Sequence, residues 1–148
     1  MQASFKDILD HLPYTEPFLF VDALEVVSEE GVTGTYQFKE DAFFYKGHFK
    51  DFPVTPGVIL TECMAQIGVV CLGIFLTDSV ATNNAMIALS HHEVMYYKAV
   101  APGETVTVTS KKIYFRFNKL KCKVQMRNVS GALVCEGTIS GMLQIRSS

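Results

Sequence analysis

Three residues that can move a proton or hold a developing negative charge stand close together in the sequence: His48, Gly57 and Glu62. Glu62 lies in an otherwise apolar run, where a carboxylate loses hydration unless it is paired or faces a cavity. Burial raises the pKa of such a carboxyl group and preserves the proton that a general acid needs. His48 lies in a loop, and a loop histidine by itself is more often structural than catalytic. Glu62 is therefore the firmer catalytic candidate of the two.

Gly57 adds a possible site for negative charge, because it stands where a helix is expected to begin. The first N–H groups of a helix have no partner within the helix, and the helix dipole is positive there. Glycine also lets a substrate carbonyl approach the backbone closely. A base, an acid and an oxyanion site suit removal of a proton next to a carbonyl group, followed by β-elimination.

The apolar run from Val58 to Leu76 predicts the one long helix that must position these groups. Thr55 is expected to cap this helix, and Pro56 suits its first turn because the N–H that proline lacks would have no partner there. About 20 helical residues at about 1.5 Å each give a rod of about 30 Å, long enough to span a small domain.

A helix of this length also matches the thickness of a membrane, so this alternative must be weighed. The uninterrupted apolar part after Gln66 has only ten residues, two of them glycine, whereas a spanning helix needs about 20 apolar residues. Glu62 and Gln66 are four residues apart and place two polar groups on one face. A helix that is apolar almost all round is also typical of a buried core. We therefore expect a core helix and no membrane span.

The rest of the chain predicts a short N-terminal helix and mainly antiparallel strands. Ser4 to Asp7 fits a capping box ahead of a helix that ends near Pro13. One buried helix against a curved sheet is an α+β hotdog fold, formed by residues 1–148 as a single domain. The open sheet edge and the apolar helix predict a dimer. Five to seven strands are expected, with a hairpin tip at Asn118–Lys119. The candidate strand segments are Phe18–Val27, Gly31–Phe38, Ala85–Tyr97, Thr105–Phe117, Leu120–Val129 and Ala132–Ile145.

The composition is that of a globular chain, with 49% apolar and 19% charged residues. Its four cysteines have neither CxxC spacing nor matching histidines, so we expect no metal site and no redox motif. Cys63 and Cys71 lie in the apolar run and are expected to be buried thiols. Reduced thiols and a polar, acidic start without an export signal favour the cytoplasm.

Seven basic residues and no acidic ones occur between positions 111 and 127. Such a pattern is usually the solvated face of a strand, but clustered positive charge also attracts an acidic partner. The net charge of −2 gives no reason to expect nucleic acid. We refer to these residues as the basic cluster: Lys111, Lys112, Arg116, Lys119, Lys121, Lys123 and Arg127.

The segment around His48 and Glu62 resembles the FabA/FabZ family of 3-hydroxyacyl-acyl-carrier-protein dehydratases. The family signature GHF…P…PGV…E-x-x-A-Q is matched without a gap between its histidine and its glutamate. The likeness extends upstream to the opening LPxxxPFLxVD and downstream to a strand and turn that end in PGD, so it covers almost the whole chain. The matching residues are Gly47-His48-Phe49, Pro53, Pro56-Gly57-Val58, Glu62, Ala65-Gln66, Leu12-Pro13, Pro17-Phe18-Leu19, Val21-Asp22 and Tyr97 to Glu104.

This resemblance implies a role for each matching residue. His48 would be the catalytic base and Glu62 the acid, while Gly57 would donate its N–H to the thioester carbonyl. The Val54 carbonyl would hold the other nitrogen of His48, and Phe49 and Gln66 would support the site. A glutamate at position 62 is the FabZ type, which implies dehydration without isomerisation of the double bond.

The resemblance also implies the partners and the form of the substrate. In the family the active sites form across a dimer interface, and the phosphopantetheine arm of acyl carrier protein delivers the substrate without a metal or bound organic cofactor. Carrier proteins of this family are acidic, so the basic cluster, with Lys46, Lys50 and Lys98, is a candidate docking surface. An apolar tunnel beside the helix is expected for the acyl chain, although residues of this kind are more often plain core. Its candidate residues are Phe43, Phe44, Met64, Ile67, Met86 and Ile87.

Some positions depart from the family pattern. Lys50 and Asp51 follow Phe49 where the family usually has proline and glycine, Thr55 replaces methionine, and Cys63 replaces alanine. These changes bear on the substrate rather than the reaction, and leave open its chain length, saturation or aryl group, and a housekeeping or a specialised polyene or polyketide pathway. Two other functions stay open: a hotdog thioesterase, and a non-catalytic domain that binds acyl carriers. Assembly into a hexamer, or with a second hotdog subunit, is also open.

Overall fold

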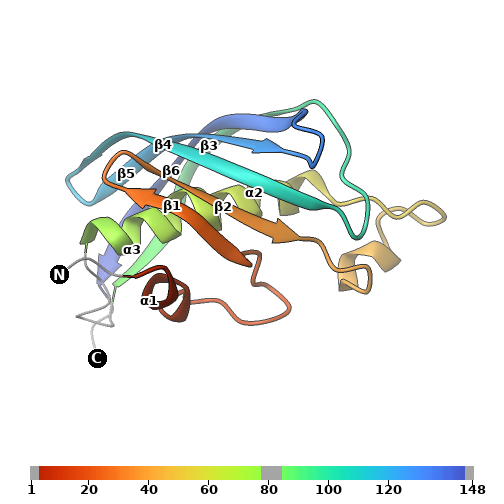
Figure 1. Ribbon diagram of the computed structural model, residues 1–148, viewed down its shortest axis with the longest axis horizontal. Coiled ribbons are helices and arrows are strands. Elements are labelled where there is room, and N and C mark those ends of the chain that lie inside the picture. Colours follow the sequence, from red (N-terminus) through yellow and green to blue (C-terminus); the bar gives the residue numbers. More distant parts are fainter. Residues whose placement is uncertain (1–3, 78–84, 146–148) are drawn as a thin grey trace.

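The computed structural model describes residues 4–77 and 85–145 of the chain. Six strands form one antiparallel sheet in the order β1-β2-β4-β5-β6-β3, and Figure 1 shows this sheet curving over one side of a long central helix. This is the α+β hotdog arrangement that the sequence predicts. The elements are α1 (Phe5–Asp10), β1 (Ala23–Ser28), β2 (Gly31–Gln37), η1 (Phe43–Lys46), α2 (Gly57–Ala65), η2 (Gln66–Cys71), α3 (Leu72–Thr77), β3 (Ala85–Tyr96), β4 (Thr105–Arg116), β5 (Lys119–Arg127) and β6 (Leu133–Ile145).

The segments α2, η2 and α3 follow one another without a break and form the central helix, Gly57–Thr77. Its middle part, η2, has a wider π-helical backbone, and the buried Ser110 hydroxyl of β4 donates to the Gly68 carbonyl at 2.9 Å. Length and hydropathy alone would allow this helix to cross a membrane, but 83% of its most apolar window is buried inside the fold. The helix is the core of the domain, as the sequence predicts.

The predicted cap of the central helix is wrong. Pro56 is the N-cap residue and no side chain caps the helix. The Thr55 hydroxyl is instead hydrogen-bonded to the Tyr45 hydroxyl at 2.6 Å, and its backbone N–H donates to the Val100 carbonyl at 2.9 Å. These two bonds fix the chain just before the helix begins, so Thr55 contributes to the loop rather than to the helix end.

Several strand boundaries also differ from the prediction, most of them by one or two residues. The first strand begins at Ala23 rather than Phe18, because the segment before it lies against the central helix and bonds to it through the Phe20 N–H. The tip of the β4–β5 hairpin is Phe117–Asn118 rather than Asn118–Lys119, since Arg116 pairs with Lys119 across the ladder. The capping box at Ser4 and Asp7 is confirmed.

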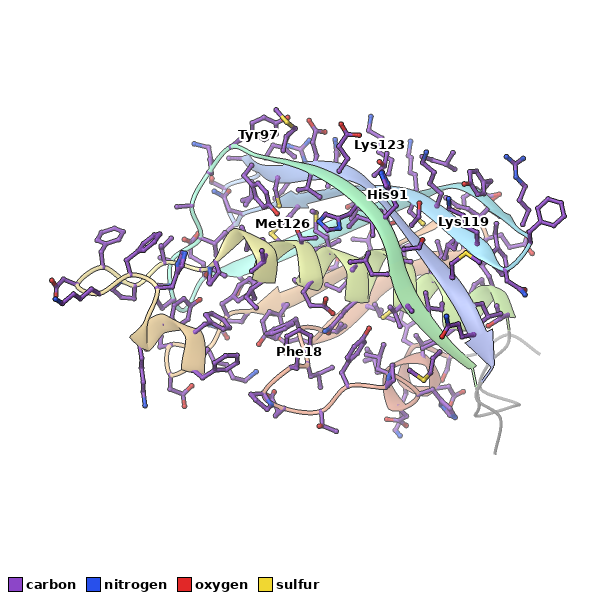
Figure 2. All side chains as sticks on the ribbon, turned by 180° about the vertical axis from the view of Figure 1, so that it is seen from behind. Phe18, His91, Tyr97, Lys119, Lys123 and Met126 are labelled. Carbon is purple, nitrogen blue, oxygen red and sulfur yellow. The ribbon has the colours of Figure 1, made fainter. Side chains whose placement is uncertain are left out.

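Alternation along β5 explains how the sheet covers the helix. Leu120, Cys122, Val124 and Met126 are buried, while the residues between them are partly or fully exposed. Figure 2 shows Met126 on the helix side of the sheet and Lys123 on the opposite side. Much of the basic cluster therefore lies on the outer face of the sheet.

The sheet ends at β3, which pairs only with β6 among the described strands. This edge strand is twelve residues long and carries several exposed apolar side chains. A long, unpaired and apolar edge is normally covered by a partner, because its N–H and C=O groups are free to pair with another strand. The exposed apolar residues of β3 are Met86, Leu89, Met95 and Tyr96.

Candidate active site

Glu62 lies on α2 at the wall of a cavity of about 320 Å³ between the central helix and β3. Burial raises the pKa of its carboxyl group above the ordinary value, and a hydrogen bond from Gln66 offsets part of that rise. The Tyr14 phenol shares this cavity, and burial together with the nearby Glu62 charge raises its pKa well above the usual range. The lining residues are Pro13, Tyr14, Phe18, Glu62, Ala65, Val69, Val70, Met86, Ile87, Ala88, Leu89, Ile139, Ser140 and Gly141.

Gln66 fixes both Glu62 and the opposite wall of this cavity. Its Nε2 donates to Glu62 Oε2 and to the Phe18 carbonyl, each at 3.0 Å. Its Oε1 accepts from the Phe20 N–H at 2.8 Å. Because Gln66 is fully buried, one side chain holds the glutamate in place and joins the segment before β1 to the helix. Figure 2 shows Phe18 on the side of the helix away from the sheet.

His48 lies between η1 and α2, in the segment that projects past the end of the sheet in Figure 1. Its Nδ1 is 2.9 Å from the Val54 carbonyl oxygen, and the Val54 N–H donates back to the His48 carbonyl at 2.9 Å. Its ring is stacked on the Phe49 ring, with 3.8 Å between the ring centres. A carbonyl oxygen can only accept, so Nδ1 carries the proton in the neutral ring and Nε2 has a free lone pair. His48 is thus oriented as a proton acceptor.

Gly57 is the first residue of α2, where the backbone N–H has no acceptor within the helix. A Cβ atom at this position would lie 3.2 Å from the Tyr96 ring, so the ring packs directly against the glycine. The Tyr96 hydroxyl is hydrogen-bonded to the Thr61 hydroxyl one turn further along the helix. Tyr14 and Tyr96 are not predicted from the sequence, because nothing in their spacing distinguishes them from ordinary core aromatics.

Within one chain the structure does not bring His48 and Glu62 together. His48 is absent from the lining of the cavity that Glu62 faces, and no hydrogen bond joins the two side chains among the described residues. The cavity is instead lined by Met86, Ala88 and Leu89 of β3, the strand at the edge of the sheet.

Comparison with known proteins identifies the family. Residues 12–139 match the family model described as a FabA-like domain. The chain belongs to this family. It is 31% identical over 143 residues to the 3-hydroxyacyl-[acyl-carrier-protein] dehydratase FabZ of Ehrlichia chaffeensis. The matched region covers 96% of this chain and 96% of the relative. It is 29% identical over 136 residues to the FabZ of Clostridium perfringens, covering 92% of this chain and 95% of the relative.

Solved structures support the fold of this FabA-like protein. A chain of the dehydratase heterocomplex ApeI:P from Xenorhabdus doucetiae matches with a TM-score of 0.79 at 15% identity, covering 94% of this chain and 91% of that one. A hypothetical thioesterase from Streptococcus pneumoniae matches with a TM-score of 0.59 at 14% identity, covering 84% and 87%. At such low identities these likenesses show the hotdog fold alone.

The tunnel candidates of this FabA-like protein lie in different surroundings. Met86 and Ile87 line the cavity beside Glu62. Met64 and Ile67 are fully buried in the core and do not line it. Phe44 packs edge-on against the Tyr45 ring at 4.6 Å between ring centres, and Phe43 is exposed on η1. The acyl tunnel stays a prediction, and of the six residues Met86 and Ile87 are those whose position fits it.

The candidate docking residues are spread over three parts of the chain. Lys111 and Lys123 face each other across β4 and β5, as do Arg116 and Lys119. Lys46 ends η1, Lys50 lies in the loop between η1 and α2, and Lys98 lies between β3 and β4. Lys112 pairs with the buried Cys122 and so lies on the helix side of the sheet. The other six residues of the basic cluster share the outer face of the β4–β5 hairpin, and Lys46, Lys50 and Lys98 lie outside it.

Replacing Gln66 with leucine tests how much its buried hydrogen bonds stabilise the fold. The change leaves the Phe20 N–H and the Phe18 carbonyl without their buried partner, at a cost of about 1–3 kcal/mol for each unsatisfied group. We expect a lower midpoint of urea unfolding, measured by circular dichroism. The matched control is Gln37→Leu, because Gln37 is exposed and its side chain makes one surface hydrogen bond. Equal midpoints for the two variants would contradict the role of Gln66.

Proposed function

We propose that this FabA-like protein removes water from a 3-hydroxyacyl thioester on acyl carrier protein and forms the trans-2-enoyl thioester. The curated relatives that match nearly the whole chain are named for this reaction. The observation that carries the proposal is the position of the Glu62 carboxyl group at the wall of an otherwise largely apolar cavity. Burial there raises the pKa of this group. A carboxyl group that keeps its proton beside an apolar chain can protonate a departing hydroxyl group.

The reaction needs a base as well as an acid, and His48 supplies it. Its Nε2 takes the proton from C2 of the substrate, and the Val54 carbonyl stabilises the imidazolium ion that forms. The Gly57 N–H and the positive end of the helix dipole stabilise the negative charge on the thioester oxygen. Glu62 gives its proton to the 3-hydroxyl group, which leaves as water while the C2–C3 double bond forms. Transfer of a proton from His48 to Glu62 restores both groups for the next cycle.

A homodimer completes the site in this proposal. Pairing of β3 with its copy in a second subunit would cover the exposed Met86, Leu89 and Met95 side chains and satisfy the free edge of the sheet. The twofold axis would then bring the loop between η1 and α2, which carries His48, from one subunit to the cavity that Glu62 of the other subunit faces. This arrangement accounts for the separation of the two residues within one chain.

The remaining features concern the substrate and the surroundings of the enzyme. The cavity beside Met86 and Ile87 takes the acyl chain, and the phosphopantetheine arm of the carrier delivers it, so the chemistry requires no further cofactor. The four thiols are free and buried, which fits the reducing cytoplasm.

Replacing Glu62 with glutamine tests the proposed reaction. The wild-type protein should form enoyl thioester, followed by its ultraviolet absorbance, from a series of straight-chain 3-hydroxyacyl carrier substrates. Glu62→Gln should reduce kcat at least about 100-fold, because the amide has no acidic proton to give. The control Glu136→Gln changes an acidic side chain on the sheet, outside the cavity, and should keep full activity. Release of free thiol without enoyl product would instead indicate a thioesterase.

The basic cluster is the proposed docking surface for the acidic carrier. Directly opposed like charges, as at Lys111 and Lys123, destabilise a sheet, and an acidic partner would relieve that repulsion. The hairpin that carries the cluster lies close to the cavity: the Leu143 N–H donates to the Asn118 carbonyl at 2.7 Å, and Leu143 pairs with Ile87. A carrier bound there would have its flexible arm near the proposed site.

Charge reversal at Lys123 tests this docking surface. Lys123→Glu should raise KM for the carrier-bound substrate about 3- to 10-fold and leave KM for the matching pantetheine thioester unchanged. Lys6→Glu is the matched control, because Lys6 is an exposed lysine on α1, away from the basic cluster. The docking surface would be refuted by equal effects of the two variants, or by an equal effect on both substrates.

A further inference from the structure

The tip of the β4–β5 hairpin carries an aromatic residue in an unfavourable position. Phe117 has φ 52° and Asn118 has φ 62°, so both occupy the left-handed region that a tight two-residue hairpin requires. Asparagine tolerates this conformation, but for a bulky side chain it is strained. Phe117 is also 91% exposed and gains almost no burial in return. The fold of the subunit gives no reason for phenylalanine at this position.

The surroundings of Phe117 are charged and of one sign. Arg116 and Lys119 face each other at the base of the tip. The Arg116 guanidinium lies over the Tyr114 ring, 4.4 Å from its centre, which holds the charge beside the hairpin. The two ion pairs found among the described residues involve Lys6 and Lys39, so neither Arg116 nor Lys119 forms one there. Glu136 interacts electrostatically with Lys123 and Arg127, but it pairs with Gln125, towards the other end of β5. An exposed aromatic ring surrounded by unpaired cations fits a partner with an acidic surface and an apolar depression.

The position of the tip relative to the cavity narrows the choice of partner. Asn118 is bonded to Leu143 of β6, and Leu143 is paired with Ile87 of β3, which lines the cavity. Two strand spacings therefore separate the tip from the cavity wall, about 10 Å across the sheet. A partner that presents a substrate to this cavity would touch the hairpin. Figure 2 shows Lys119 close to the hairpin tip and Lys123 further along β5.

We propose that Phe117 is the apolar anchor by which this protein binds its acidic acyl carrier protein, with the surrounding cations orienting the carrier. The inference rests on the proposed function and adds to it a contact residue that the charge pattern alone does not reveal. Interfaces of this kind depend on a few aromatic anchors at the centre and on charges at the rim.

The test compares Phe117→Ala with Val129→Ala in steady-state dehydration. Val129 is the matched control, because it is an apolar residue, 82% exposed, in the connection at the other end of β5. Phe117→Ala should raise KM for the carrier-bound substrate about tenfold, with kcat and the KM for the pantetheine thioester unchanged. Val129→Ala should change none of these values. A carrier KM for Phe117→Ala equal to that of the wild type would overturn the proposal.

A second variant separates binding from folding. Phe117→Asn places a residue that tolerates positive φ at the tip, so its Tm should equal or exceed that of the wild type. Its KM for the carrier substrate should nevertheless rise as in Phe117→Ala. A carrier KM at the wild-type value in this variant would exclude the anchor.

Two further outcomes keep this proposal distinct from its alternatives. A wild-type protein that dehydrates neither the carrier-bound nor the pantetheine-bound substrate refutes the proposed function itself. Sedimentation with phosphatidylglycerol vesicles that is lost in Phe117→Ala, together with an unchanged carrier KM, would overturn the carrier anchor and assign the hairpin to a lipid surface.

Discussion

The buried amide of Gln66 is the interaction on which the proposed site depends. It donates to Glu62 and to the Phe18 carbonyl and accepts from the Phe20 N–H, so one side chain connects the central helix to the segment before β1. That segment forms one wall of the cavity, and Glu62 forms part of the other. Burial favours the neutral form of the Glu62 carboxyl group, and the hydrogen bond from the Gln66 amide favours the charged form. Burial is the larger of the two effects. Gln66 therefore holds the Glu62 carboxyl group in place, in surroundings that raise its pKa.

The second constraint is the unpaired edge of the sheet. A helix that is buried almost all round needs the curved sheet to cover it, and the sheet then ends at β3 with its apolar side chains exposed. This edge borders the same cavity that Glu62 faces. In the proposed dimer, one contact would cover the edge and bring the second catalytic residue to the site. Stability of the assembly and activity would then depend on the same surface.

The residues explain which features could be predicted from the sequence and which could not. The central helix, the strands and the capping box at Ser4 follow from local patterns of polarity, and the family follows from the spacing between His48 and Glu62. The prediction that Thr55 caps the helix was wrong, because the Thr55 hydroxyl is hydrogen-bonded to Tyr45. No local sequence pattern reveals this tertiary contact. The hairpin tip was displaced by one residue because a phenylalanine with positive φ contradicts the usual turn preferences. Tyr14 and Tyr96 acquire their neighbours only when the sheet closes on the helix.

Mixing two inactive variants tests most directly the claim that His48 and Glu62 act from different subunits. His48→Ala and Glu62→Gln are each expected to be inactive as homodimers. After the two are unfolded together and refolded, half of the dimers should be mixed, each with one intact site, so the activity should return to about a quarter of the wild-type value. Activity that stays at the level of the separate variants, although native mass spectrometry detects the mixed dimer, would contradict the shared site.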